Sequence, residues 1–307
     1  MQGICNLPAG FFDEEERLGY RVSSEMKKIW AIELELMEEL DRVCSRLNLR
    51  YFLDSGTLLG AVRDGHFIPW DDDIDVILLR EDYDTLIQKG EHLFSQDYHL
   101  QCAYTDVDYP RGHAQLRKKN TCAMIPYEAK HVKFDQGIFI DIFVLDGVTT
   151  DEQKLAGQFK DKNRIMWKME TVGIPASTKP LNTIIKKVLR AYYKLTAAPI
   201  KDLFKKYEEI CKRYNSSNYV DKIMFRETVD AVIPLEREWY AETVMVPFEG
   251  GLFPAPIGYE EVCKAYYGDN YMIPAKAPSA HGSTILDDTR SYKQVLKEMK
   301  NKRFSKM

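Results

Sequence analysis

Four aspartates fall within five residues of this chain: Asp71, Asp72, Asp73 and Asp75. The apolar, β-forming run 76–79 follows at once, so the acidic group is expected at the head of a buried strand. Alternate residues of a strand share a face, which would bring the carboxylates of Asp73 and Asp75 side by side. Two negative charges about 4 Å apart repel by about 4 kcal/mol at an effective dielectric of about 20. A divalent cation, Mg²⁺ or Mn²⁺, removes this repulsion, and the pattern therefore predicts a metal site.

A pattern typical of phosphate binding precedes the acidic run. After a short strand, we expect a turn at residues 54–57 and a short helix at residues 58–63, whose first turn has free backbone N–H groups. Gly56 lets the backbone approach a ligand closely, and Ser55 or Thr57 offers a hydroxyl donor or a helix cap. Together the two patterns predict one site for a nucleotide diphosphate and its metal.

Other interpretations of the acidic run fit less well. A calcium loop of the EF-hand type needs Gly at its sixth position and Glu at its twelfth, where this chain has Val76 and Asp82. An Asp-Asp-x-x-Asp signature of prenyl synthases also matches, but it belongs on a helix, whereas Pro69 and the β-branched Ile74 favour a strand. A purely solvated acidic turn is the remaining alternative.

The segments that carry these motifs resemble the LicD family. The similar segments are residues 55–63 and 65–76, then residues 137–147, with a weaker block at residues 267–274. The resemblance implies an α/β (α+β) fold with a nucleotidyltransferase-like mixed sheet core and a helical insertion. It also implies transfer of phosphocholine or a related phospho-alditol group to glycans, with the fukutin-related proteins as distant relatives. Val144 stands where the family pattern leads us to expect Pro.

The resemblance implies that Asp73, Asp75 and Asp141 are the catalytic residues and the metal ligands. The sequence supports the third independently, because Asp141 interrupts the apolar run 138–145. A lone carboxylate in a buried strand is costly unless it is paired or bound to metal. Asp146, which precedes a glycine, is interpreted as a turn residue.

The implied donor is CDP-choline or a similar CDP-linked molecule. The implied acceptor is a hydroxyl of a cell-surface glycan, such as teichoic acid or lipopolysaccharide, or its lipid-linked precursor, and CMP would leave. We expect Arg63 and Arg117 to contact phosphate and Trp70 to hold a quaternary ammonium by cation–π attraction. The alternatives are an interaction of Arg63 with its own helix C-terminus, a solvated edge for Arg117 and core packing for Trp70.

Two functions of other kinds remain open. A metal-dependent glycosyltransferase also uses an Asp-x-Asp at a strand end, but it would release a nucleoside diphosphate. A non-catalytic module that binds a nucleotide or glycan is the second alternative.

The composition is that of an ordinary globular protein. The chain has 307 residues, 45% of them hydrophobic, and a formal net charge of −4, which predicts no general affinity for nucleic acid. Its apolar runs are short and its first residues are acidic, so we expect neither a membrane span nor a leader, and a cytoplasmic location. The six cysteines lack close C-x-x-C spacing and are expected to stay reduced.

The chain is expected to divide into three parts: a catalytic core with an N-terminal helix (1–150), a helical, basic region (151–235), and an aromatic and Pro-rich segment that packs back on the core (236–307). Apolar periodicity predicts a helix at 24–47 and another at 81–89, with strands at 98–104 and 113–125.

The interval 179–215 has ten Lys or Arg against three acidic residues. Within it Ile184, Val188, Tyr192 and Leu195 mark one face of a predicted helix, and Lys186, Lys187, Arg190 and Lys194 mark the opposite face. We expect either a surface helix packed on the core with solvated lysines, or contact with an anionic glycan or the inner membrane face.

Overall fold

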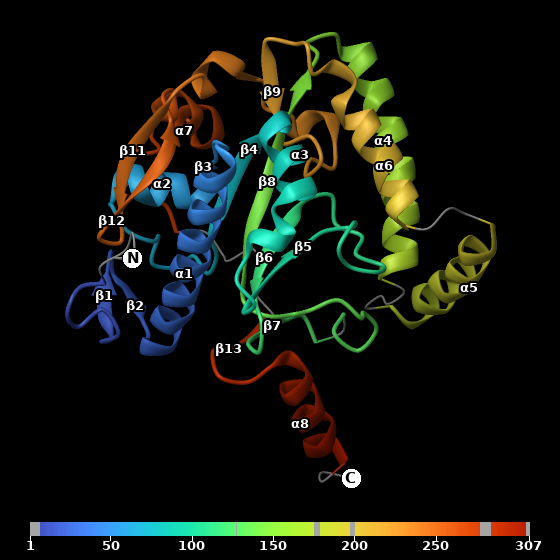
Figure 1. Ribbon diagram of the computed structural model, residues 1–307, viewed down its shortest axis with the longest axis horizontal. Coiled ribbons are helices and arrows are strands. Elements are labelled where there is room, and N and C mark those ends of the chain that lie inside the picture. The colour runs from blue at the N-terminus through green and yellow to red at the C-terminus, as the bar shows by residue number, and fades with distance from the viewer. Residues whose placement is uncertain (1–6, 127, 175–178, 197–199, 277–283, 305–307) are drawn as a thin grey trace.

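A curled mixed sheet built around one long strand forms the centre of the fold (Figure 1). The computed structural model describes residues 7–126, 128–174, 179–196, 200–276 and 284–304. The long strand, β8 (Phe139–Val148), pairs in parallel with β4 (Asp75–Leu79) along one edge. Its other edge pairs antiparallel with β6 (Ala114–Lys118) and, farther along, with β9 (Tyr219–Asp221). The sheet continues through β3 (Phe52–Leu53) beside β4, β5 (Tyr98–Gln101) beside β6 and β10 (Leu235–Glu236) beside β9. The expected mixed α+β fold is confirmed.

Two helices cover the face of this sheet that is turned to the viewer in Figure 1, α1 (Ser24–Leu47) and α3 (Arg80–Lys89). The helix predicted at 24–47 is confirmed. It begins where the Ser23 hydroxyl accepts a hydrogen bond from the Met26 N–H, and it ends where Asn48 adopts a left-handed φ of 55°. The predicted helix at 81–89 begins one residue earlier, at Arg80, and ends before Gly90 as expected.

The predicted strands are shorter or divided. The strand expected at 98–104 ends at Gln101, and the segment expected to be one strand at 113–125 is two, β6 and β7 (Cys122–Met124). A turn separates them, in which Asn120 has a φ of 65°. Asparagine tolerates this left-handed conformation, which breaks the extended backbone.

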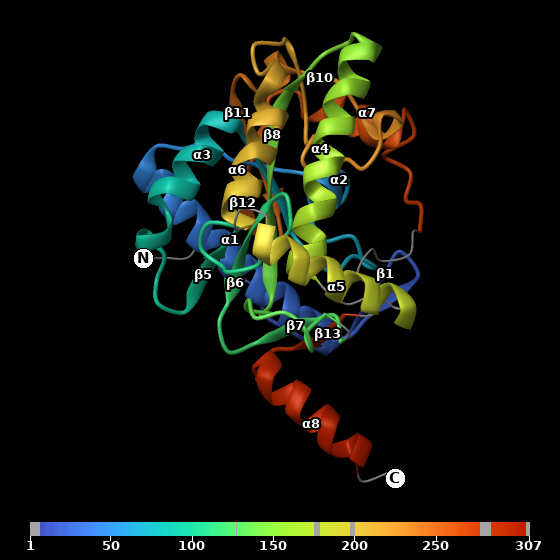
Figure 2. The same cartoon turned by 90° about the vertical axis from the view of Figure 1, so that its right-hand side faces the viewer.

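Between residues 151 and 235 most of the described chain is helical, as predicted. Helices α4 (Glu152–Gly173) and α6 (Ile200–Cys211) pack together, and α5 (Pro180–Thr196) lies away from the sheet (Figures 1 and 2). None of the described helices is both long and apolar enough to span a bilayer.

The last part of the chain returns to the core. The hairpin of β11 (Thr243–Phe248) and β12 (Gly251–Pro256) and helix α7 (Tyr259–Tyr267) pack near α2 (Ser55–Arg63) and β3. Strand β13 (Ile285–Asp287) pairs with β7, and α8 (Tyr292–Phe304) projects beyond it. Near the N-terminus, β1 (Glu15–Arg17) pairs with β2 (Tyr20–Val22). One buried apolar cluster extends from Phe11 to Tyr271. The division into three parts stays a prediction.

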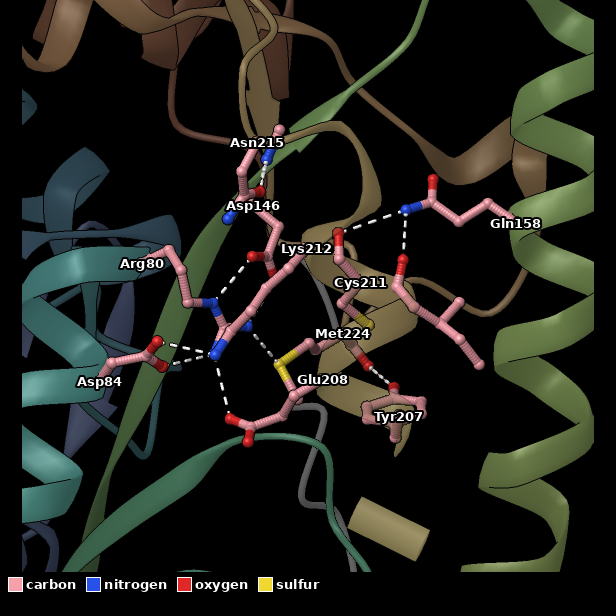
Figure 3. Close-up of polar contacts among 12 residues, drawn as sticks. Arg80, Asp84, Asp146, Gln158, Tyr207, Glu208, Cys211, Lys212, Asn215 and Met224 are labelled. Atoms are coloured by element: carbon pink, nitrogen blue, oxygen red, sulfur yellow. Dashed lines mark hydrogen bonds and ion pairs between the residues drawn. The ribbon is translucent and has the colours of Figure 1, made fainter. Parts of the chain in front are cut away.

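The far end of β8 is fixed by a buried ion pair, shown in Figure 3. The Arg80 guanidinium donates to both carboxylate oxygens of Asp146, at 2.8 and 2.5 Å, and to Glu208 at 3.1 Å. The turn predicted for Asp146 is therefore wrong, because this residue lies within β8 and is fully buried. The glycine that suggested the turn serves close packing instead: a Cβ on Gly147 would lie 2.0 Å from the Tyr214 carbonyl oxygen.

Candidate active site

The pairing of β4 with β8 brings the predicted acidic residues together. Asp75 is the first residue of β4, and in the parallel register it lies opposite Asp141 on β8. Asp73 lies in the segment just before β4, which corrects the expectation that both residues sit in the strand. One carboxylate oxygen from each of Asp73, Asp75 and Asp141 lies within 4.8 Å of the others. Asp71, Asp72 and Asp73 meet the same criterion, so Asp73 belongs to two neighbouring acidic groups.

These carboxylates repel one another in a buried setting. Burial, and then the charges of Asp75 and Asp71, raise the pKa of Asp73 well above its ordinary value. Burial and the charge of Asp141 do the same to the pKa of Asp75. Three oxygen donors of this kind, held close together, match the hard ligands that Mg²⁺ and Mn²⁺ prefer. The donor set therefore fits a divalent cation.

The predicted phosphate turn is the first turn of helix α2, which begins at Ser55, three residues earlier than expected. Ser55 has a φ of 49°, a left-handed value that is uncommon for a residue with a side chain. Gly56 faces the acidic segment so closely that a Cβ there would lie 2.3 Å from Asp71 Oδ2. Thr57 is buried, and its hydroxyl accepts a hydrogen bond of 2.9 Å from the Asp75 N–H. This contact fixes the start of β4, and the ligand contact expected of Thr57 stays a prediction.

A cavity of about 630 Å³ opens beside the turn and the acidic residues. This volume lies within the usual range for small-molecule sites. Its lining includes Gly56, Arg63, Trp70, Asp73, Tyr267 and Tyr271. Arg63 and Trp70 therefore line the cavity, and their contacts with phosphate and a quaternary ammonium stay predictions. The weakly similar block near the C-terminus contributes two aromatic rings.

Comparisons with known proteins identify the sequences that this chain resembles. Residues 48–184 match the family described as "LicD/FKTN/FKRP, nucleotidyltransferase domain". The chain carries a LicD family domain. The lipopolysaccharide cholinephosphotransferase LicD of Haemophilus influenzae is 26% identical over 243 residues, which cover 78% of this chain and 89% of that protein. Uncharacterized proteins of Rickettsia prowazekii and Rickettsia typhi are 39% and 41% identical over 69 and 63 residues, which cover 22% and 20% of this chain.

One residue at the site lies outside the LicD domain match and was missed by the sequence analysis. Lys222, directly after β9, places its Nζ 2.5 Å from Asp54 Oδ2 and 2.5 Å from Ser55 Oγ. The ammonium is buried and lies 5.0 Å from the ring centre of Phe143 and 4.9 Å from that of Tyr266. A single lysine far along the chain from the turn gives no local signal, so only the folded structure shows this contact.

Within the LicD domain, two side chains contact the carboxylate of Asp141. Gln115 Nε2 donates to Asp141 Oδ1 at 2.7 Å, and His113 Nε2 lies 3.1 Å from the same oxygen. Arg117 in turn donates to Gln115 Oε1 at 2.5 Å and to Gln101 Oε1 at 2.6 Å. Its guanidinium is fully buried, and burial lowers the pKa of Arg117 to about 10. The phosphate contact predicted for Arg117 is therefore wrong. Arg117 instead holds Gln115, which donates to Asp141.

A second missed residue is Glu33 of α1. Its side chain is buried, and burial followed by the charges of Asp72 and Asp71 raises the pKa of Glu33 well above its ordinary value. The signal was present in the sequence, because Glu33 lies four residues after Ile29 and four before Met37 on the apolar stripe of α1. A carboxylate in such a stripe is buried with the stripe.

Proposed function

We propose that this protein transfers phosphocholine, or a related phospho-alditol group, from a CDP-linked donor to a glycan hydroxyl and releases CMP. The observation that carries the proposal is the convergence of Asp73, Asp75 and Asp141 beside the first turn of α2, at the wall of one cavity. The Haemophilus influenzae relative is named a lipopolysaccharide cholinephosphotransferase, which supports the choice of transferred group and acceptor.

Asp73, Asp75 and Asp141 are the residues that would hold Mg²⁺ or Mn²⁺. When bound, the cation would neutralise diphosphate oxygens and stabilise the charge that grows on the departing CMP. This assignment accounts for three carboxylates that would otherwise repel one another without compensation.

The first turn of α2 would bind the diphosphate through its backbone N–H groups, which have no acceptors within the helix. The absence of a side chain at Gly56 lets the turn lie against Asp71, and so brings the phosphate close to the acidic residues. Lys222 is bonded to the side chains of Asp54 and Ser55 and stabilises the strained start of this turn.

The rings that line the cavity would take the transferred group. Trp70, Tyr267 and Tyr271 lie on its wall, and aromatic faces attract a quaternary ammonium. The acceptor hydroxyl would attack the phosphorus farther from the cytidine, and the bond from that phosphorus to the bridging oxygen would break. The bridging oxygen would leave with CMP, and the hydroxyl proton would pass to Asp141, which Gln115 and His113 hold in a fixed orientation.

We also propose peripheral contact with a membrane surface, because a lipid-linked glycan precursor would present the acceptor there. The expected cytoplasmic location remains a prediction.

The test is a reconstituted reaction with purified protein, Mg²⁺, a panel of CDP-linked donors and soluble candidate oligosaccharides. Chromatography would measure CMP, and mass spectrometry would measure a gain of phosphocholine on the acceptor. We expect both products with CDP-choline or a close analogue, and neither with excess chelator or in the Asp73→Asn variant. Acceptor-dependent activity that survives in Asp73→Asn would refute the assignment.

The same reaction separates the alternatives. A glycosyltransferase would consume a nucleotide sugar and release a nucleoside diphosphate. A binding module would retain the donor, detected by equilibrium dialysis, without forming either product.

A further inference from the structure

Helix α5 presents its apolar side to solvent. Six large apolar residues at three- and four-residue spacing form what we call the α5 stripe: Leu181, Ile184, Ile185, Val188, Tyr192 and Leu195. Their exposed fractions lie between 48% and 87%. An amphipathic helix on the surface of a globular protein normally turns such a stripe toward the core. Packing against the core of this chain therefore does not explain the α5 stripe.

The polar side of α5 faces the protein. Arg190 donates to Asp108 at 2.8 Å, and both side chains are mostly shielded from solvent. Lys186 is partly buried and acts electrostatically on Glu170 of α4. The expected helix packed on the core with solvated lysines is therefore wrong, because the apolar side is exposed and the ion pair of Arg190 with Asp108 turns the opposite side toward the protein. The side chain of Lys194 lies outside the described residues.

The surroundings of the α5 stripe are positively charged. The helix contains four Lys or Arg and no Asp or Glu. Lys187 is exposed at the border of the stripe, and Lys130 is exposed in a neighbouring loop. Burial, followed by the charges of Lys187, Lys130 and Arg190, lowers the pKa of His131, which places these cations around one point of the surface.

We propose that α5 lies in the interface of an anionic lipid bilayer, with the α5 stripe inserted among the acyl chains and Lys187 and Lys130 at the headgroups. Exposed apolar residues along one side of a helix and cations beside them are the pattern of interfacial helices. At 17 residues the helix is about 25 Å long, so it can lie on a bilayer in the surface plane.

A second copy of this chain is the less favourable occupant. A two-fold contact through the α5 stripe would place the same surface on both sides of the interface. Lys187 and the neighbouring cations would then face their own copies, and α5 has no carboxylate to compensate them. An anionic lipid surface supplies the compensating charge.

This proposal rests on the proposed function only for its biological purpose, which is to bring the cavity to a lipid-linked acceptor. Its test is independent of catalysis. The full chain would be sedimented with vesicles of phosphatidylcholine alone, and with vesicles that contain 30% phosphatidylglycerol. We expect binding to the anionic vesicles, weaker binding at high salt, and little binding to the neutral ones.

The decisive variant carries Ile184→Gln and Val188→Gln, because glutamine keeps helix propensity and removes apolar surface. Its affinity for anionic vesicles should fall about tenfold or more. The matched control carries Met245→Gln and Leu252→Gln, two exposed apolar residues of the β11–β12 hairpin, and should bind like the wild type. Far-ultraviolet circular dichroism and thermal unfolding establish that both variants are folded.

A spectroscopic measurement locates the contact. Trp167 is 49% exposed, and its ring lies edge-on to Tyr193 of α5, with 6.2 Å between ring centres. Brominated lipids should quench its fluorescence, and Trp167→Phe should remove that quenched component.

Three results would overturn the proposal: equal binding of the α5 variant and the wild type, no binding of the wild type to anionic vesicles, or a dimer in solution that the α5 variant disrupts. The α5 variant should keep wild-type transfer to a soluble oligosaccharide. Loss of that activity in both proteins would contradict the proposed function and leave the vesicle result to decide on α5.

Discussion

Replacing Asp75 with asparagine should stabilise the cation-free protein while abolishing transfer. Its carboxylate lies within 4.8 Å of those of Asp73 and Asp141. At that separation each ionised pair repels by about 3.5 kcal/mol at an effective dielectric of about 20. Two effects reduce the gain from removing this repulsion. The variant loses the attraction between Asp75 and Lys222, and the folded wild type already weakens the repulsion by keeping some of its acids protonated. We expect the free energy of unfolding to rise by about 1–3 kcal/mol at pH 8.

The sign of the pH dependence follows from the raised pKa of Asp75. Unfolded aspartate loses its proton near pH 4, whereas the folded protein keeps this proton to higher pH. Between the two pKa values the folded state binds more protons, so the free energy of unfolding falls as pH rises. The stability that Asp75 contributes is complete below the pKa that it has in the unfolded chain. This contribution is lost as the pH rises through the higher pKa that Asp75 has in the folded protein. The advantage of Asp75→Asn should therefore grow from acid toward pH 8.

The assay is urea denaturation followed by circular dichroism from pH 5 to pH 8, with chelator and then with Mg²⁺. Mg²⁺ should stabilise the wild type in proportion to the logarithm of its concentration and leave Asp75→Asn nearly unchanged. Asp230→Asn, at an exposed aspartate, is the matched control and should follow the wild type. The reasoning is refuted if Asp75→Asn is less stable than the wild type at pH 8 in chelator, or if Mg²⁺ stabilises both equally.

Three further substitutions test other parts of the structure. Gly56→Ala places a Cβ 2.3 Å from Asp71 Oδ2, so transfer should fall at least about 100-fold with little change in thermal unfolding, and wild-type kinetics would contradict this packing. Lys222→Met removes the cation at the α2 turn and should lower kcat/KM for the donor by about 10- to 100-fold; an unchanged value would exclude this role. Asp146→Ala leaves the Arg80 charge buried without its main partner and should cost about 3–5 kcal/mol in urea denaturation, whereas a cost below about 1 kcal/mol would show that water reaches the pair.

The sequence predicted those parts of the site whose signal is local. The run of aspartates before an apolar strand located Asp73 and Asp75, because charge repulsion and strand periodicity act over a few residues. Asp141 was predictable because a carboxylate within an apolar strand demands a partner. Their convergence also depends on the parallel pairing of β4 and β8, a register that the sequence did not predict and that the structure shows.

Properties that depend on distant pairing were not predictable. Arg117 and Thr57 each have a polar group suited to phosphate, but their partners, Gln115 and the start of β4, are set by tertiary packing. The Asp146 prediction failed because an Asp-Gly pair is typical of a turn, and only the neighbouring Tyr214 backbone explains the glycine. The orientation of α5 was missed because periodicity identifies an apolar stripe without showing which side meets the protein.

Lys222 and the rings of Tyr267 and Tyr271 have a consequence for biosynthesis. They follow residue 184, where the family match ends, by dozens of residues, yet they contact the turn or the cavity wall. A nascent chain synthesised only to the end of its LicD segment would therefore have the acidic residues but would lack Lys222 at the α2 turn and two rings of the cavity wall. Fragments cut at the end of that segment should have no transferase activity, and activity should arise only after the chain has been synthesised through Tyr271.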